Sequence, residues 1–179
     1  MILLKNINLL ISTFRYNETN AKAELWFSLV ICGDKYPIIS DLEYSGLIAA
    51  LSNIEAKEVI SKFKKITLDD PSFFKNILKV VPIDFVCKSD LAQINQIIKK
   101  NYKNYIKEDD SFRISLNRRK NELINRKDLI RIIARNITNP VNLENPDKII
   151  RIEVLGGFCG ISFLRKDDIF KPMKKKRKN

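Results

Sequence analysis

Three cations recur at regular spacing in a segment whose other residues are mostly apolar. The segment RKDLIRIIARNI covers residues 126–137, and its Lys127, Arg131 and Arg135 are each four residues apart. On a helix this spacing places all three side chains on one face. Like charges at this spacing cost about a few tenths of a kcal/mol without a counter-anion, and only Asp128 offsets them locally. We therefore favour phosphate contact over the alternative, a solvated face without a ligand.

Residues on either side of this segment extend the candidate site. Arg118, Arg119 and Lys120 follow one another at the end of a predicted strand. The Gly156-Gly157 pair predicts a tight hairpin, since primed turns need positive φ. A backbone without side chains also lets a sugar-phosphate chain approach closely, so Gly157 and Gly160 remain candidate RNA contacts. Neither a dinucleotide-binding fingerprint nor a P-loop is present, because no Lys-Ser/Thr follows the glycines and no helix is predicted to open there.

One aromatic side chain is a candidate for stacking on a base. Tyr16 follows Arg15 at the end of the first predicted strand, and a ring beside a cation suits a single-stranded nucleic acid. We include Arg15 among the candidate contacts. Most of the other aromatics that could stack are better explained as core residues; these are Phe14, Trp26, Phe158 and Phe163.

The positive charge is confined to the second half of the chain. The net charge is +12, yet residues 1–87 hold ten basic and ten acidic residues, whereas residues 88–179 hold twenty-three and eleven. Six of the basic residues follow Phe170, which leaves +6 on residues 88–170. Such one-sided charge is typical of a protein that binds a polyanion.

Several kinds of catalysis lack their usual residues. The chain has no histidine, which excludes a Ser-His-Asp triad and His-based metal motifs. Cys32, Cys87 and Cys159 are isolated in the sequence and form no C-x-x-C pair, so they are interpreted as buried apolar residues. We expect no catalytic residues, metal or cofactor, although an enzyme that uses Asp, Glu, Lys or Cys remains an alternative.

Periodicity predicts an α+β chain of two units. In the first unit, strands are predicted over residues 7–15, 36–40, 46–51 and about 76–81, and helices over 18–31 and 52–65, the second helix opened by a capping box in SNIE. This order is that of a ferredoxin-like unit. In the second unit, helices are predicted over 90–106 and 126–137, and strands over 112–118, 149–155 and 158–165. The basic segment 171–179 is predicted to be disordered.

The second unit resembles the THUMP domain, an RNA-binding module of tRNA-modifying proteins. The residues that carry the resemblance are FRISLNRR, RKDLIRIIARNI and VNLENPDKIIRIEVLGGFCGISFLRKDDIF, of which the closing strand is the most specific. The first unit, with INLLISTFR, AELWFSLVICGD, SGLIAAL and NILKVVPIDFV, looks like the ferredoxin-like domain that precedes THUMP. The expected domains are thus 1–86, ferredoxin-like, 87–170, THUMP, and 171–179, a basic tail.

The resemblance implies an RNA-binding adaptor. Family members usually carry a catalytic domain as well, for which we expect no room here, and the arrangement is similar to an adaptor that helps an acetyltransferase form N4-acetylcytidine in tRNA. In the family, the two units together hold the acceptor 3′ end. We expect tRNA and a separate modifying enzyme as partners, in the cytoplasm and without a membrane. Arg165, which ends the closing strand, joins the candidate RNA contacts.

Three other functions remain possible interpretations of the sequence. The chain could serve a methylation or thiolation complex instead, or it could be a stand-alone RNA-modifying enzyme. It could also be a protein-interaction domain whose basic face meets an acidic partner. Salt-sensitive RNA binding without turnover would separate the adaptor from the last two.

Overall fold

The computed structural model describes residues 6–121 and 124–172, and the chain divides into two compact units. Unit 1 comprises residues up to Pro82 together with the segment from Asp168 onward, and unit 2 spans Ile83–Asp167. The division precedes the predicted boundary at residue 86, because residues 85–88 form a strand of the second sheet. Most of the predicted tail, from residue 173 on, lies outside the described residues.

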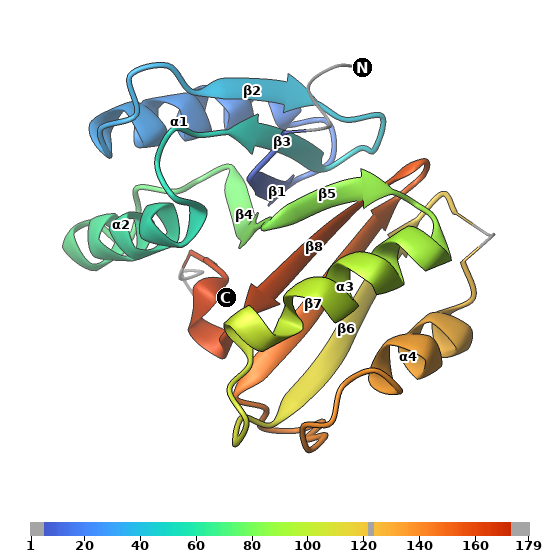
Figure 1. The fold of residues 1–179 in the computed structure, drawn as a ribbon. Coiled ribbons are helices and arrows are strands. Elements are labelled where there is room, and N and C mark those ends of the chain that lie inside the picture. Colours follow the sequence, from blue (N-terminus) through green and yellow to red (C-terminus); the bar gives the residue numbers. More distant parts are fainter. Residues whose placement is uncertain (1–5, 122–123, 173–179) are drawn as a thin grey trace, which may run out of the picture. The chain divides into compact units, whose positions relative to one another are not determined.

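Unit 1 has the predicted order of strands and helices. Its elements are β1 (Leu9–Thr13), α1 (Glu18–Ile31), β2 (Ile38–Asp41), β3 (Leu47–Leu51), α2 (Ala56–Asp69) and β4 (Ile77–Pro82). The sheet order is β2-β3-β1-β4 and every pair is antiparallel (Figure 1). Both helices pack on one face, since Leu25 of α1 and Phe63 of α2 share a buried cluster with Ile11 and Ile48 of the strands. The ferredoxin-like prediction is confirmed.

The predicted capping box of α2 is wrong. Ser52 donates its hydroxyl to the buried carboxylate of Asp34 at 2.6 Å and accepts from the backbone N–H of Ile54 at 3.1 Å, so it forms a turn before the helix. Glu55 caps the helix instead, accepting from the backbone N–H of Glu58 at 3.0 Å. The helix therefore begins at Ala56, after the residues that the local pattern indicated.

The segment after unit 2 returns to unit 1. Phe170 is 1% exposed and packs edge-on against Phe63 and Phe74. Its backbone exchanges hydrogen bonds with Val80 at 2.9 and 3.0 Å. Residues 168–170 therefore belong to unit 1, whereas the sequence placed them in the second domain.

Unit 2 is a second four-stranded sheet. Its elements are β5 (Phe85–Lys88), α3 (Leu91–Tyr105), β6 (Phe112–Arg119), α4 (Arg126–Ala134), β7 (Lys148–Leu155) and β8 (Phe158–Leu164). The order is β5-β8-β7-β6, in which β6 and β7 are parallel and the other pairs antiparallel. The short edge strand β5 was not predicted. α4 ends three residues early, at Ala134, because Asn136 turns its side chain back to the carbonyl of Ile132.

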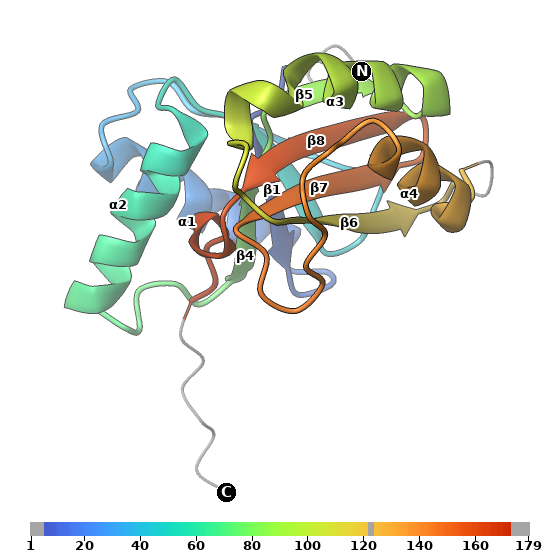
Figure 2. The same ribbon diagram turned by 60° about the horizontal axis from the view of Figure 1, so that its bottom comes forward.

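Both helices of unit 2 cover the same face of its sheet (Figure 2). Ile98 of α3 and Ile133 of α4 are buried in one cluster with Leu116, Ile152 and Ile161 of the three longer strands. The alternation of side chains along each strand thus decides which residues face the helices and which face away. Within residues 6–121 and 124–172, no helix combines the length and apolar character that crossing a bilayer requires.

Candidate nucleic-acid interface

The parallel strands β6 and β7 end together and bring four predicted residues to one edge of the sheet. Arg119 pairs with Leu155 at the end of the register. Its carbonyl accepts from the N–H of Gly156 at 3.0 Å, and Asn121 donates to the carbonyl of Gly156 at 2.8 Å. Arg118, Arg119, Lys120 and Gly157 are exposed here, and we call them the carboxyl-end cluster. Lys120 has a φ of 47°, a left-handed conformation that is uncommon for lysine.

Arg118 also supports the fold of this cluster. Its Nη1 donates to the carbonyl of Ile124 at 2.5 Å, and Nη1 of Arg126 donates to the carbonyl of Leu116 at 3.2 Å. These two guanidinium groups hold the connection from β6 to α4 against the strand. A substitution of Arg118 would therefore disturb the local structure as well as the charge.

The glycines differ in what the fold requires of them. Gly156 has a φ of 55° at the first position of the two-residue turn between Leu155 and Phe158, as in a type II′ hairpin. Gly157 is not in the left-handed region, and a Cβ there would meet no heavy atom within 4 Å. The fold therefore leaves Gly157 open to a functional role. A Cβ on Gly160 would lie 3.0 Å from the side chain of Ile83, which explains that glycine by packing.

The predicted basic face of α4 is formed, with one internal partner. Lys127, Arg131 and Arg135 are exposed, and successive residues are separated by about 6 Å along the helix axis. Asn125 caps the helix by accepting from the backbone N–H of Lys127 at 2.9 Å. Arg131 forms an ion pair with Asp128 at 2.8 Å, with side chains 61% and 47% exposed. An exposed pair of this kind contributes about 0.5 kcal/mol or less, so a phosphate can replace the carboxylate.

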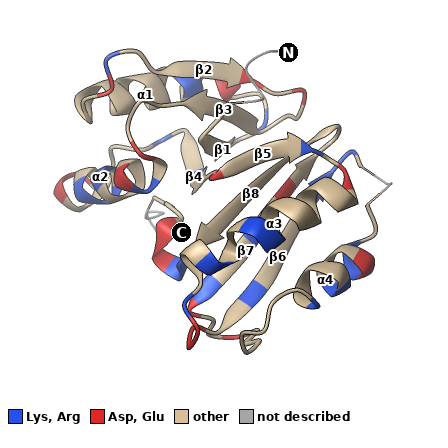
Figure 3. Ribbon diagram, viewed as in Figure 1, with Lys and Arg blue, Asp and Glu red and all other residues tan. Residues whose placement is uncertain are grey.

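A second basic row lies on α3 and was missed by the sequence analysis. Lys99, Lys100 and Lys103 are exposed on this helix, and Leu91–Tyr105 contains no acidic residue. Figure 3 shows basic positions along α3. None of the three lysines forms an ion pair with any residue that the structure describes. Lys99 and Lys103 are four residues apart, which is the same spacing as that of the predicted basic residues on α4. We call these three residues the α3 basic row.

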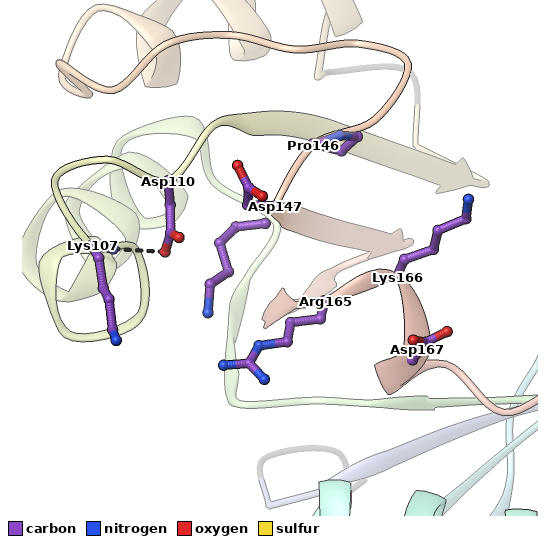
Figure 4. Close-up of a pocket in the computed structure, with 8 residues that line it drawn as sticks. Lys107, Asp110, Pro146, Asp147, Arg165, Lys166 and Asp167 are labelled. Atoms are coloured by element: carbon purple, nitrogen blue, oxygen red, sulfur yellow. Dashed lines mark hydrogen bonds between the residues drawn. The ribbon is translucent and has the colours of Figure 1, made fainter.

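A pocket of about 350 Å³ lies just beyond the end of α3. The ring of Tyr105 stacks on Phe163, with centroids 4.6 Å apart, and this contact fixes the end of the helix over the end of β8. Four basic and three acidic residues line the pocket together with Pro146; they are Lys107, Lys148, Arg165, Lys166, Asp110, Asp147 and Asp167. Figure 4 shows the charged ends of Lys107 and Arg165 directed to the same side, away from the carboxylate of Asp147.

Neutral donors hold two of the pocket's carboxylates. Asp110 accepts from the backbone N–H of Lys107 at 2.9 Å. Asp147 accepts from the hydroxyl and the backbone N–H of Ser111 at 2.6 and 2.8 Å, and these bonds lower the pKa of Asp147 below its ordinary value. Lys107 and Lys148 form no ion pair within the described part of the chain. The pocket and the α3 basic row together offer ammonium groups suited to phosphate.

The structure does not bring all the predicted contacts together. Arg165 lies one position beyond the paired Leu164 of β8, whereas Phe158 at the other end of that strand adjoins the carboxyl-end cluster. The two ends are separated by roughly 23 Å along the strand. Arg15 belongs to unit 1, where it is exposed after β1.

The aromatic predictions have mixed outcomes. Phe163 is 2% exposed, as expected of a core residue, but Phe14 and Trp26 are 50% and 51% exposed. Trp26 is exposed because the buried face of α1 is formed by Ala21, Leu25, Ser28 and Leu29. Tyr16 is 92% exposed with a φ of 63°, so it is available for stacking as predicted.

Comparison with known proteins finds a domain model that matches most of unit 2. Residues 88–164 match the THUMP domain model. The THUMP domain-containing protein 1 homolog of Drosophila melanogaster is 32% identical over 99 residues, which is 52% of this chain and 31% of that protein. The chain thus spans about a third of the relative's length.

Solved structures share the fold at low sequence identity. PH1313 from Pyrococcus horikoshii Ot3 has a TM-score of 0.63 and 20% identity, with 89% of this chain and 55% of that chain covered. TrmN from Thermus thermophilus has a TM-score of 0.58 and 11% identity, covering 88% and 45%. A 4-thiouridine synthetase, solved with RNA and ATP, has a TM-score of 0.51 and 15% identity, covering 89% and 42%. At these identities the likeness concerns the fold.

Proposed function

We propose that this chain, in which residues 88–164 match the THUMP domain model, binds tRNA at its acceptor 3′ end and presents it to a separate modifying enzyme. The domain match supports RNA binding in the context of tRNA modification, and one protein of the same fold was solved in complex with RNA. The step from domain to adaptor rests on the resemblance to an adaptor that helps an acetyltransferase form N4-acetylcytidine in tRNA.

The observation that carries the proposal is the cationic surface of unit 2. Lys99 and Lys103 are separated by about 6 Å along α3, and Lys107 follows at the pocket. On α4, Lys127 and Arg131 repeat the same interval. Cations spaced in this way match successive phosphates of a nucleic acid strand and release its counterions on binding.

These contacts give affinity rather than sequence selection. Ammonium and guanidinium groups meet phosphates without reading bases, so discrimination among RNAs comes from the shape of a folded RNA with a single-stranded end. Gly157, which the turn does not require, lets the backbone of such an end approach the carboxyl-end cluster. Tyr16 and Arg15, which are exposed in unit 1, remain separate candidates for base stacking and for phosphate contact.

We assign the chemical step to the partner enzyme. The adaptor alone then leaves tRNA unmodified with acetyl, methyl or sulfur donors, and the resemblance favours an acetyltransferase that forms N4-acetylcytidine. Methylation or thiolation complexes are the alternative, since SMU.472, which was solved in complex with SAH, and the 4-thiouridine synthetase share the fold.

Nucleoside analysis of tRNA from cells depleted of the protein tests this assignment. We expect N4-acetylcytidine to disappear while other modified nucleosides persist, and re-expression of the full chain to restore it. Loss of a methylated or thiolated nucleoside instead would identify the alternative partner. Turnover of tRNA by the purified protein alone would refute the adaptor role.

A further inference from the structure

Two cysteines that are distant in the sequence lie opposite each other in unit 2. The register of β5 and β8 pairs Cys87 directly with Cys159. In an antiparallel pair, opposed residues have Cα atoms about 4.5–5.5 Å apart and side chains on the same face. A disulfide requires Cα atoms about 4.4–6.8 Å apart. The backbone geometry of this pair therefore suits a cross-strand disulfide.

Both side chains of the pair lie at the same hydrophobic cluster. Cys159 is fully buried in the core beneath the helices, and the half-buried Cys87 packs against the same cluster. The interaction between the two thiols lowers the pKa of Cys87 and raises that of the buried Cys159. A lowered pKa makes Cys87 the better nucleophile of the two. By contrast, burial raises the pKa of Cys32, which lies at the end of α1 in unit 1.

We propose that the Cys87–Cys159 pair is a site of reversible oxidation that closes to a disulfide in the presence of a peroxide. The Cys87 thiolate attacks one oxygen of hydrogen peroxide, the O–O bond breaks, and hydroxide leaves, forming a sulfenic acid. The Cys159 sulfur then attacks the Cys87 sulfur and releases water. Together the two thiols lose two electrons and two protons, and the peroxide becomes two water molecules. The inference does not depend on the proposed function.

Peroxide treatment of the full chain followed by alkylation with N-ethylmaleimide tests the site. Digestion without reductant and mass spectrometry should yield a peptide pair joined through Cys87 and Cys159, with only Cys32 alkylated. The intact mass should fall by two hydrogen atoms, and a thiol reductant should reverse this. Because the bond closes a loop of about 70 residues, the melting temperature of the oxidised protein should rise by about 5 °C or more.

Two variants separate the pair from general thiol oxidation. Cys32→Ser should retain the cross-link, and Cys87→Ser should abolish it and leave Cys159 unoxidised in the core. Failure of Cys87→Ser to fold would leave the wild-type digest to decide. Sulfinic acid on Cys87 without a cross-link, or disulfides formed only between separate chains, would overturn the proposal.

Discussion

The α3 basic row offers a quantitative test of phosphate contact. Lys99→Gln combined with Lys103→Gln removes two exposed ammonium groups that have no ion-pair partner in the described part of the chain. Lysine and glutamine have similar helix propensities. Lys103 also lies in the last turn, where a cation interacts favourably with the helix dipole. Because the substitution removes that interaction, we expect a loss of stability of about 1 kcal/mol at most.

The magnitude follows from counterion release. Each lost phosphate contact should flatten the slope of log K against log salt by about 0.7 to 0.9. Two lost contacts flatten it by about 1.4 to 1.8. Between 200 and 50 mM salt, the ratio of wild-type to variant affinity for tRNA should then change by roughly 7- to 12-fold.

The assay is tRNA binding by fluorescence anisotropy at several salt concentrations, with a charge-matched control. Lys65→Gln combined with Lys75→Gln removes two exposed lysines from unit 1 and leaves the α3 basic row intact. The control should keep the wild-type slope, and Arg131→Gln combined with Arg135→Gln should resemble the α3 double variant. A wild-type slope in the α3 variant would refute phosphate contact by the α3 basic row. Equal flattening in the control would indicate a general effect of net charge instead of a contact at that row.

Further expected outcomes concern the turns and loops that hold the site. Gly156→Ala should cost about 1–2 kcal/mol because its φ is positive, whereas Gly157→Ala should melt like the wild type in a thermal scan and still bind tRNA more weakly. The pKa of Asp147 is lowered in the folded state, so its stabilisation is complete above its ordinary pKa and is lost as pH falls through the folded value; Ser111→Ala should therefore destabilise at pH 7 and have little effect at pH 2 in denaturant titrations. Asn139 donates to three carbonyls of the α3–β6 loop at 2.6, 3.2 and 3.0 Å, and Asn139→Ala should lower the free energy of unfolding by about 1–2 kcal/mol, with an unchanged urea midpoint counting against it.

Local patterns predicted most of the fold because they are local in origin. α1 begins and ends at the residues that its apolar spacing indicated, and the two-residue turn pairs Leu155 with Phe158 as the glycines required. Long-range partners determined what was missed. The Ser52 hydroxyl donates to Asp34, and the backbone of Phe170 exchanges hydrogen bonds with Val80. Neither interaction can be predicted from the neighbouring residues in the sequence.

The candidate site was predictable in part for the same reason. The four-residue spacing on α4 was found, and applying it to Lys99 and Lys103 would have found the α3 basic row. The pocket was not predictable, because it depends on Tyr105 stacking on Phe163 to bring Lys107 near Arg165. Three-dimensional packing, rather than spacing, assembles that group of charges.

Binding of the purified full chain to intact tRNA and to tRNA lacking its single-stranded 3′ end tests the central claim most directly. Both RNAs carry nearly the same charge, so a purely electrostatic surface binds them equally well. The proposed adaptor should bind intact tRNA more tightly at 150 mM salt, with affinity falling steeply as salt rises. Equal affinity for the two RNAs would contradict recognition of the acceptor end, and affinity independent of salt would contradict phosphate contact by unit 2.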